Sequence, residues 1–341
     1  MSDVLPGIAQ FGRVATLLLF NQTGEGLDLS ELRFHFEISA SDVETPNTAQ
    51  IRIYNLAQMT VDLAIKEYTN VVISAGYEGN TAEIFKGTVK QYRRGKENNV
   101  DSFLDIYAAD SDTAYNFGIV NTSLQAGNSP SQRAAQLVAG MQASASAAQT
   151  SVDATAAQGG VSLDPAATKY LNGTGGILPR GKVMFGLARS YMRDLATTAK
   201  SRWSIQNGVV TLIPLSSYIQ DNPIVLNSGT GLIGVPEATE QGIVLECLLN
   251  PLIRIGRPVR LNNADITSAT IKQQFFPGYT DFNLIATVDS STDGLYRPVV
   301  VEHVGDTRDT PWYTKIIALL IDQSSAPADS VAPYGIPASG G

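Results

Sequence analysis

The chain has 341 residues, of which 43% are hydrophobic and 16% are charged, and its formal net charge is −8. This length predicts two or three domains, with a core large enough to need neither disulfides nor a structural metal. The acidic balance argues against a basic nucleic-acid-binding face, and one cysteine with two histidines almost excludes a Cys/His zinc site.

The N-terminus has no basic segment followed by an apolar one, so no signal peptide is expected. The longest apolar runs, Val14–Phe20 and Ile316–Ile321, are too short to span a bilayer. We therefore expect a soluble, acidic, multidomain protein made in a reducing compartment.

Residues 1–123 carry a net charge of −7 and predict β-structure. Leu32–Ile38 alternates apolar and polar residues, which is typical of a strand with one buried face. Leu56–Tyr68 has helical spacing through Leu56, Met59, Leu63 and Ile65, and predicts a helix between strands. The other predicted strands are Ile51–Tyr54, Asn70–Tyr77, Glu83–Tyr92 and Ser102–Ala108, with hairpin turns at Gly79-Asn80 and Gly95–Asn99.

Residues 124–235 are mildly basic and predict an α/β region. An Ala/Ser-rich insert covers 124–160, in which a helix is expected to begin at Pro130. Its apolar stripe consists of Ala134, Leu137, Val138 and Met141. A loop over Leu171–Gly181, a helix over Lys182–Lys200 and a hairpin with an Asn207-Gly208 turn follow.

Residues 236–341 carry a net charge of −5, and residues 236–323 again predict strands, with Ile243, Leu245, Cys247 and Leu249 on one face of the first. The remaining predicted strands are Val259–Leu261, Leu284–Val288, Val299–Val304 and Tyr313–Ile321. Residues 324–341 contain three prolines and no apolar period, so a mobile tail is expected.

No motif predicts catalysis, a cofactor or a metal. Gly176–Lys182 fits the spacing of a phosphate-binding loop, but Val183 stands where Ser or Thr is needed, so a loop capping the next helix is the better interpretation. His303 neighbours Glu302, but adjacent strand residues face opposite sides, which favours a surface or interface histidine. Cys247 is expected to be a buried apolar residue.

The candidate interface residues are aromatic or basic. Phe275, Phe276 and Tyr279 surround a Pro-Gly turn, where they either fold over the core or contact another subunit. Trp312 precedes the final strand as a packing anchor, with an interface role as the alternative. Arg254 and Arg257 are expected to pair with acidic groups in this chain or another.

Several segments together resemble the tail hub proteins of long-tailed bacteriophages, the baseplate hubs of the late control protein D group. In the C-terminal half these are Gly242–Asn250, Pro251–Leu261 and the series His303, Gly305, Asp306, Thr307, Arg308, Trp312, Tyr313, Thr314. In the N-terminal half they are Leu32–Ile38, Asn47–Leu56, Ile73–Gly79 and Ile84–Val89, and in the middle Arg202–Ile213. The resemblance covers about two-thirds of the chain, and the 124–160 insert departs from the pattern.

The resemblance implies a β-rich α+β fold, with two tail-tube-like β-barrel domains at 1–123 and 236–323 flanking an α/β middle domain. It implies a non-enzymatic virion protein of the tail baseplate, assembled in the cytoplasm of the host bacterium. Three copies would form a pseudo-six-fold ring joining the tail tube to the spike, with other baseplate proteins nearby, and DNA would pass without specific binding. The alternatives are the hub of a phage-like contractile injection particle and a hub with cell-wall-degrading activity in its middle region.

Overall fold

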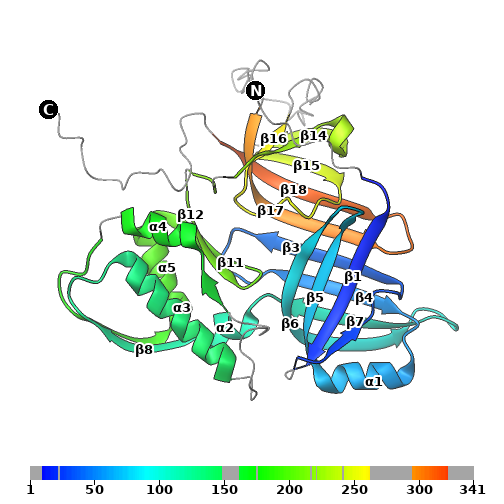
Figure 1. Cartoon of the computed structure of the whole chain (residues 1–341), viewed down its shortest axis with the longest axis horizontal. Coiled ribbons are helices and arrows are strands. Elements are labelled where there is room, and N and C mark those ends of the chain that lie inside the picture. The colour runs from blue at the N-terminus through cyan, green and yellow to red at the C-terminus, as the bar shows by residue number, and fades with distance from the viewer. Residues whose placement is uncertain are drawn as a thin grey trace, which may run out of the picture.

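A computed structural model describes residues 10–21, 24–147, 161–173, 176–215, 217–219, 221–239, 242–261 and 294–321 (Figure 1). The candidate residues Phe275, Phe276 and Tyr279 and the predicted strand Leu284–Val288 lie outside these ranges. The end of the Ala/Ser-rich insert and the 324–341 tail also lie outside them.

The first part of the chain forms the predicted strands. In β3, Phe34, Phe36 and Ile38 are buried while His35 and Glu37 face outward, as the alternation predicts. The β5–β6 turn follows Tyr77 and contains Gly79 at a φ of 81°, a left-handed conformation that favours glycine. The strands are β1 (Arg13–Asn21), β2 (Gly26–Asp28), β3 (Phe34–Ser41), β4 (Thr48–Tyr54), β5 (Tyr68–Tyr77), β6 (Asn80–Lys96) and β7 (Ser102–Ala109).

Helix α1 (Gln58–Glu67) confirms the predicted helix but not its predicted apolar face. Val61 and Ala64 are its buried residues, whereas Met59 is 86% exposed and Leu63 and Ile65 are partly exposed. The predicted face was wrong because spacing alone favoured the larger side chains, whereas the smaller residues Val61 and Ala64 are the buried ones.

The middle part packs helices against short strands. Helix α3 (Pro130–Ala147) begins at the predicted proline and buries Ala134, Leu137, Val138 and Met141. The Asn207-Gly208 turn joins β11 (Ser201–Gln206) to β12 (Val209–Pro214), with φ values of 51° and 81° that fit a type I′ hairpin. The remaining elements are α2 (Asp112–Phe117), β8 (Ile119–Leu124), β9 (Ser162–Leu163), α4 (Pro165–Gly173), β10 (Lys182–Leu187) and α5 (Ala188–Thr198).

Two predictions for this part are wrong. Residues 182–187 form strand β10, which pairs with β8, and the helix begins only at Ala188. The predicted loop over 171–181 also begins too early, because Leu171 lies in α4 and is fully buried. Val183 and Leu187 matched a four-residue helical period, but the same residues also fit the two-residue period of a strand.

The last part again consists of strands. Strand β15 (Gly242–Leu248) buries Ile243, Leu245 and Cys247, as predicted. The others are β13 (Ile224–Leu226), β14 (Leu232–Thr239), β16 (Val259–Leu261), β17 (Gly294–Asp306) and β18 (Trp312–Leu320), with a short 3-10 helix at Ser228–Thr230.

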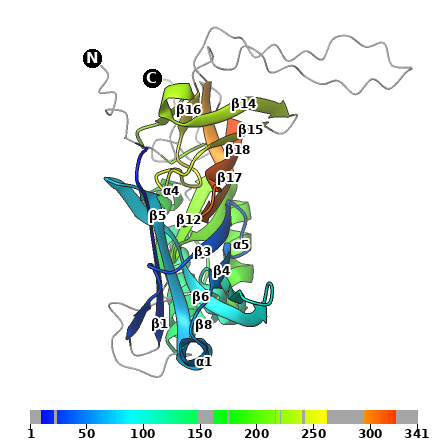
Figure 2. The same cartoon turned by 90° about the vertical axis from the view of Figure 1, so that its right-hand side faces the viewer.

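The two β-rich ends share one sheet. Within the described residues this sheet has 13 strands, which include the continuous path β14-β15-β18-β17-β3-β4-β7-β6-β5-β1-β2. The link between the ends is the antiparallel pairing of β17 with β3, from Val300 opposite Ser41 to Asp306 opposite His35. We call this pairing the seam; Figures 1 and 2 show β17 lying beside β3 between the two groups of strands.

In the part of the chain that the structure describes, three hydrophobic clusters form the core. The first contains buried residues from 17–108 together with Leu249 and Trp312, and the strands β1, β3, β4, β5 and β7 all contribute to it. The second spans 114–212 and the third 213–318. Because Leu249 and Trp312 enter the first cluster, the C-terminal part helps to complete the N-terminal core.

Candidate functional site

The Gly305–Arg308 motif lies at the end of the seam: Gly305 and Asp306 are the last residues of β17, and Thr307 and Arg308 begin the turn that follows. Gly305 packs directly beneath two aromatic rings, since a Cβ atom there would lie 2.4 Å from Phe36 and 2.9 Å from Trp312. Any larger residue would have to displace these buried rings. The glycine of the motif is therefore required by the aromatic rings that pack over it.

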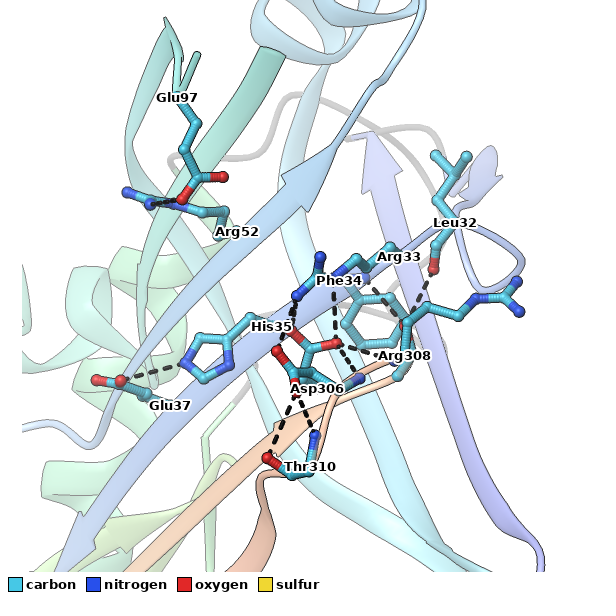
Figure 3. Close-up of polar contacts among 12 residues, drawn as sticks. Leu32, Arg33, Phe34, His35, Glu37, Arg52, Glu97, Asp306, Arg308 and Thr310 are labelled. Carbon is cyan, nitrogen blue, oxygen red and sulfur yellow. Dashed lines mark hydrogen bonds and ion pairs between the residues drawn. The ribbon is translucent and has the colours of Figure 1, made fainter. Parts of the chain in front are cut away.

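Asp306 organises the turn. Its carboxylate is buried and accepts hydrogen bonds from the backbone amides of Arg308 and Asp309, at 2.8 and 2.9 Å. The Arg33 guanidinium donates to the same carboxylate from Nε and from a terminal nitrogen, at 3.3 and 3.1 Å. Figure 3 shows Asp306 between Arg33 and the backbone at Arg308.

The remaining motif residues bond to the same short segment of the first β-part. The Thr307 hydroxyl accepts from the Phe34 amide at 3.1 Å, and its own amide donates to the Phe34 carbonyl at 3.1 Å. Arg308 donates to the Glu31 carbonyl at 3.2 Å. The motif thus fastens the C-terminal hairpin onto the start of β3.

Burial of Asp306 acts to raise its pKa, but the hydrogen bonds from Arg33 and from the turn amides outweigh it and lower the pKa below the ordinary value. Arg33 also lies 4.6 Å from the centre of the Tyr54 ring, and its own pKa is raised by the bond to Asp306. The pair is ionised at neutral pH, which suits a structural clamp rather than a proton-transfer site.

Trp312 lies in the first core cluster, with only 2% of its surface exposed. Its ring meets Phe36 edge to face at 5.7 Å, and Arg13 lies 5.5 Å from its centre. The structure therefore places Trp312 in the packing role that was predicted. An interface role stays a prediction, and the burial leaves little of the side chain for another chain to contact.

His303 is fully buried, not at the surface, because it lies on the inner face of β17. The Thr314 hydroxyl accepts from the Asn250 amide at 3.1 Å and lies 2.9 Å from Nδ1 of His303. Burial and the positive charge of Arg254 lower the pKa of His303 to about 4. The imidazole is therefore neutral near pH 7 and belongs to the core, with no carboxylate hydrogen-bonded to it among the residues described.

Arg254 and Arg257 lie in the segment between β15 and β16. Both line a cleft of about 480 Å³, to which β3, β6, β17, the start of α4 and the β11–β12 hairpin also contribute. Arg257 pairs with Asp221 at 2.8 Å, as predicted for an acidic partner. Burial and the nearby Arg257 lower the pKa of Arg254.

A polar junction that the sequence did not indicate ties the middle part to both β-parts. Buried Asp42, just after β3, lies 3.0 Å from Arg202 of β11 and 3.7 Å from Arg297 of β17. Arg297 is also buried and donates to the carbonyls of Pro214 and Ser217. Asn47 adds a bond to the Ile205 carbonyl at 3.2 Å.

The Gly176–Lys182 segment does not form a phosphate cradle. Lys182 begins strand β10 rather than a helix, so the helix N-terminus that would face a phosphate is missing there. For the same reason this loop caps no helix, which corrects that expectation too.

Neither a metal nor a membrane is indicated by the residues that the structure describes. Their His, Cys, Asp and Glu side chains form no group of three or more suited to a metal ion. Their helices include none that is both long and apolar enough to cross a bilayer.

Comparisons with known proteins identify the fold of this chain. No family model matches the chain, and no curated protein sequence matches it. The solved tail protein from Neisseria meningitidis MC58 superposes with a TM-score of 0.54 at 8% identity, over 94% of this chain and 99% of that one. The 43 kDa tail protein of prophage MuSo2 from Shewanella oneidensis gives 0.52 at 7% identity, over 89% and 97%.

A component of the type VI secretion system of E. coli gives a lower TM-score of 0.45 at 10% identity. The first two similarities show that this chain shares the β-rich fold of these two solved tail proteins, along nearly the whole length of each chain.

Proposed function

We propose that this chain is a structural hub protein of a bacteriophage tail baseplate, with no catalytic role. The observation that carries the proposal is the shared fold with two solved tail proteins, which extends over at least 89% of this chain. A match of this extent includes the middle part and both β-rich ends, which supports a structural role for the chain as a whole.

In this proposal three copies form a ring with pseudo-six-fold symmetry, because each copy supplies two related β-barrel domains at 1–123 and 236–323. The ring joins the six-fold tail tube to a three-fold spike. The seam and the Asp306 clamp support such a role, since they fix the two β-rich ends of one copy to each other. A ring that carries mechanical load needs the two β-rich ends of each copy to be held rigidly together.

The acidic composition fits passage of DNA through the ring. With a net charge of −8, acidic side chains outnumber the basic ones that would bind phosphate. The DNA duplex would therefore slide through the ring without specific binding. This part of the proposal requires the surfaces that line the channel to be acidic or neutral. A net basic lining in the assembled ring would contradict it.

A cell-wall-degrading activity of the middle part is disfavoured by what its described carboxylates do. Asp164 accepts the Ala166 amide at the start of α4, and Asp221 pairs with Arg257. Asp194 is exposed on α5. A glycosidase needs two facing carboxyl groups across one cleft, whereas Asp164 and Asp194 line different clefts and Asp221 lines neither of these.

Cryo-electron microscopy of intact particles from the source bacterium tests the proposal. We expect three copies of the chain at the distal end of the tail tube, each contributing two β-domains to a ring of six. Location elsewhere in the tail, or absence from it, would refute the hub assignment. A particle with the same ring but no DNA-filled capsid would instead identify a contractile injection device.

A further inference from the structure

The cleft that Arg254 and Arg257 line lies where all three parts of the chain meet. The first β-part contributes β3 and β6, the middle part contributes the β11–β12 hairpin and the start of α4, and the last part contributes β17 and the 251–257 segment. Its volume of about 480 Å³ is that of pockets that hold small ligands, which commonly lie between domains. We call it the central cleft.

The central cleft has apolar walls with a few polar groups among them. Ile38 of β3 and Val301 of β17 are buried there, and so are Ile253 and Ile255 of the segment between β15 and β16. A ligand gains by burying an apolar body against these side chains. Its orientation then depends on the polar groups that it meets.

The buried imidazole of His303 is one of these polar groups, and its hydrogen bond to Thr314 fixes its proton. Thr314 is fully buried, and its hydroxyl oxygen already accepts from the Asn250 amide, so the hydroxyl proton needs an acceptor. Nδ1 of His303, 2.9 Å away, is the acceptor within reach among the described residues. The neutral ring therefore carries its own proton on Nε2.

The Nε2–H group of His303 is a hydrogen-bond donor for the central cleft. It has no hydrogen-bond partner among the described residues, yet it is not one of their fully enclosed unpaired polar atoms. His303 is only 4% exposed and lines the central cleft, so the space that Nε2 reaches is the cleft itself. An acceptor atom of a ligand would satisfy this donor.

Arg254 adds a positive charge close to this donor. After burial, the charge of Arg254 is the effect that lowers the pKa of His303. Within the described ranges the exposed Arg254 guanidinium has no hydrogen bond or ion pair, whereas Arg257 is paired with Asp221. Burial and the like charge of Arg257 lower the pKa of Arg254, so a negative group beside it would be stabilised.

Two carboxylates also line the central cleft, but neither governs the space beside Arg254 and His303. Asp164 accepts from the Ala166 amide at the start of α4. Glu83 of β6 acts on Arg254 less strongly than Arg257 does, and neither carboxylate affects the pKa of His303. This end of the cleft therefore favours a negative group over a positive one.

We propose that the central cleft binds a carboxylate attached to an apolar group. One carboxylate oxygen accepts from Nε2–H of His303, and the negative charge faces the Arg254 guanidinium, a group well suited to carboxylates. The apolar walls hold the remainder of the ligand. The inference goes beyond the proposed hub function and does not depend on it. The carboxylate belongs either to a free organic acid or to an acidic side chain of another protein, and the experiment separates these sources.

Histidine NMR of the full-length protein tests the site, because the chain contains only two histidines. In protein with isotope-labelled histidine, His35→Gln removes one imidazole signal and so assigns the other to His303. Benzoate is titrated near neutral pH, with the uncharged benzamide as the control ligand. We expect a saturable shift of the His303 signal, with benzoate binding at least about tenfold tighter than benzamide. The His35 signal should not move.

Two variants separate the charge from the apolar walls. Arg254→Gln should weaken benzoate binding at least about tenfold, or about 1.4 kcal/mol, and leave benzamide binding unchanged. Arg260→Gln is the matched control, because Arg260 of β16 is exposed and does not line the central cleft. It should bind benzoate as the wild type does. Since both arginines are exposed, both variants should keep the wild-type thermal unfolding midpoint.

Three outcomes would overturn the inference. Equal binding of benzoate and benzamide would show that the central cleft selects only for an apolar group. Benzoate binding that survives Arg254→Gln would place the carboxylate elsewhere. A His303 signal that shows no saturable shift up to the solubility limit of benzoate would mean that the cleft binds no carboxylate.

A peptide pair identifies the source of the carboxylate. One is an N-acetylated tripeptide amide with aspartate between two valines, and the other has asparagine in place of the aspartate. Tighter binding of the aspartate peptide than of benzoate would assign the site to an acidic side chain of a partner protein, and weaker binding would assign it to a small organic acid. Both results support the carboxylate site. All these measurements use the purified chain, so their outcome is independent of the hub function.

Discussion

Asp110 is a buried carboxyl whose environment disfavours its charge. One of its oxygens accepts from the Ser111 hydroxyl at 2.8 Å and from the Gly208 amide at 3.0 Å. The other has no hydrogen-bond partner. Burial raises the pKa of Asp110 to about 6 against the opposing effect of these bonds. Glu83 adds a smaller effect in the same direction as burial.

The sign of the pH effect follows from the raised pKa. Between about pH 4 and pH 6 the folded state holds a proton that the unfolded state has released, so this group makes stability fall as pH rises. Asp110→Asn should therefore raise the free energy of unfolding at pH 7.5 by on the order of 1–3 kcal/mol, and by less at pH 4.5. Urea denaturation at the two pH values measures this. An equal effect at both would contradict it.

His303 has the opposite effect on how stability changes with pH. Its pKa of about 4 lies below that of an exposed histidine, so the unfolded chain takes up a proton first as pH falls from about 6.5. This group's stabilisation is complete above that pH and is lost toward pH 4. His303→Asn retains a hydrogen-bonding group for Thr314 and does not titrate. The free-energy difference between wild type and variant should shrink on acidification, and a difference independent of pH would refute the assignment.

At the scale of single elements, the turn after β17 depends on Asp306 far more than on its neighbour Asp309. Asp306→Ala leaves two backbone amides and Arg33 without their acceptor, and should cost about 2–4 kcal/mol of unfolding free energy. Asp309→Ala is the matched control. Its side chain is 56% exposed and meets Arg33 only at the surface, so it should cost about 1 kcal/mol or less. Equal costs in chemical denaturation would show that Asp306 is not the clamp.

Periodicity predicted the elements well where one face alone was apolar. The alternation in Leu32–Ile38 and the Asn207-Gly208 turn were both correct, because burial and turn chemistry act locally there. The predicted helix over Lys182–Lys200 is confirmed from Ala188 but wrong over 182–187, because β10 carries its large apolar residues on the exposed side. A prediction from local periodicity assumes that apolar side chains face the core of the same chain.

The candidate site was only partly predictable for a related reason. The motif from His303 to Thr314 was picked out by resemblance, but its partners lie some 270 positions away in the chain. The Asp42 junction could not be predicted, because no local pattern in the sequence marks Asp42, Arg202 or Arg297. Pairing at such separations becomes visible only when the strands are placed side by side.

For the whole molecule, the Asp42 junction decides whether the middle part moves with the β-rich ends. Asp42→Ala removes the counter-charge of buried Arg297 and the partner of Arg202. We expect amide hydrogen exchange to accelerate in β11 and β12, while β5 and β6 stay protected. Lys66→Ala, on the surface helix α1, serves as the control. Uniform exchange across the chain would argue against a separate attachment.

The seam has a consequence for how the protein is made. Arg33 and Asp306 are separated by 273 positions, so β3 leaves the ribosome long before the strand that completes it. At roughly 5–20 residues per second, the open edge of β3 waits on the order of 10–60 seconds. During that time it is free to pair with other nascent chains. Chaperone demand during translation should therefore concentrate on the N-terminal strands and end only when the last hairpin emerges.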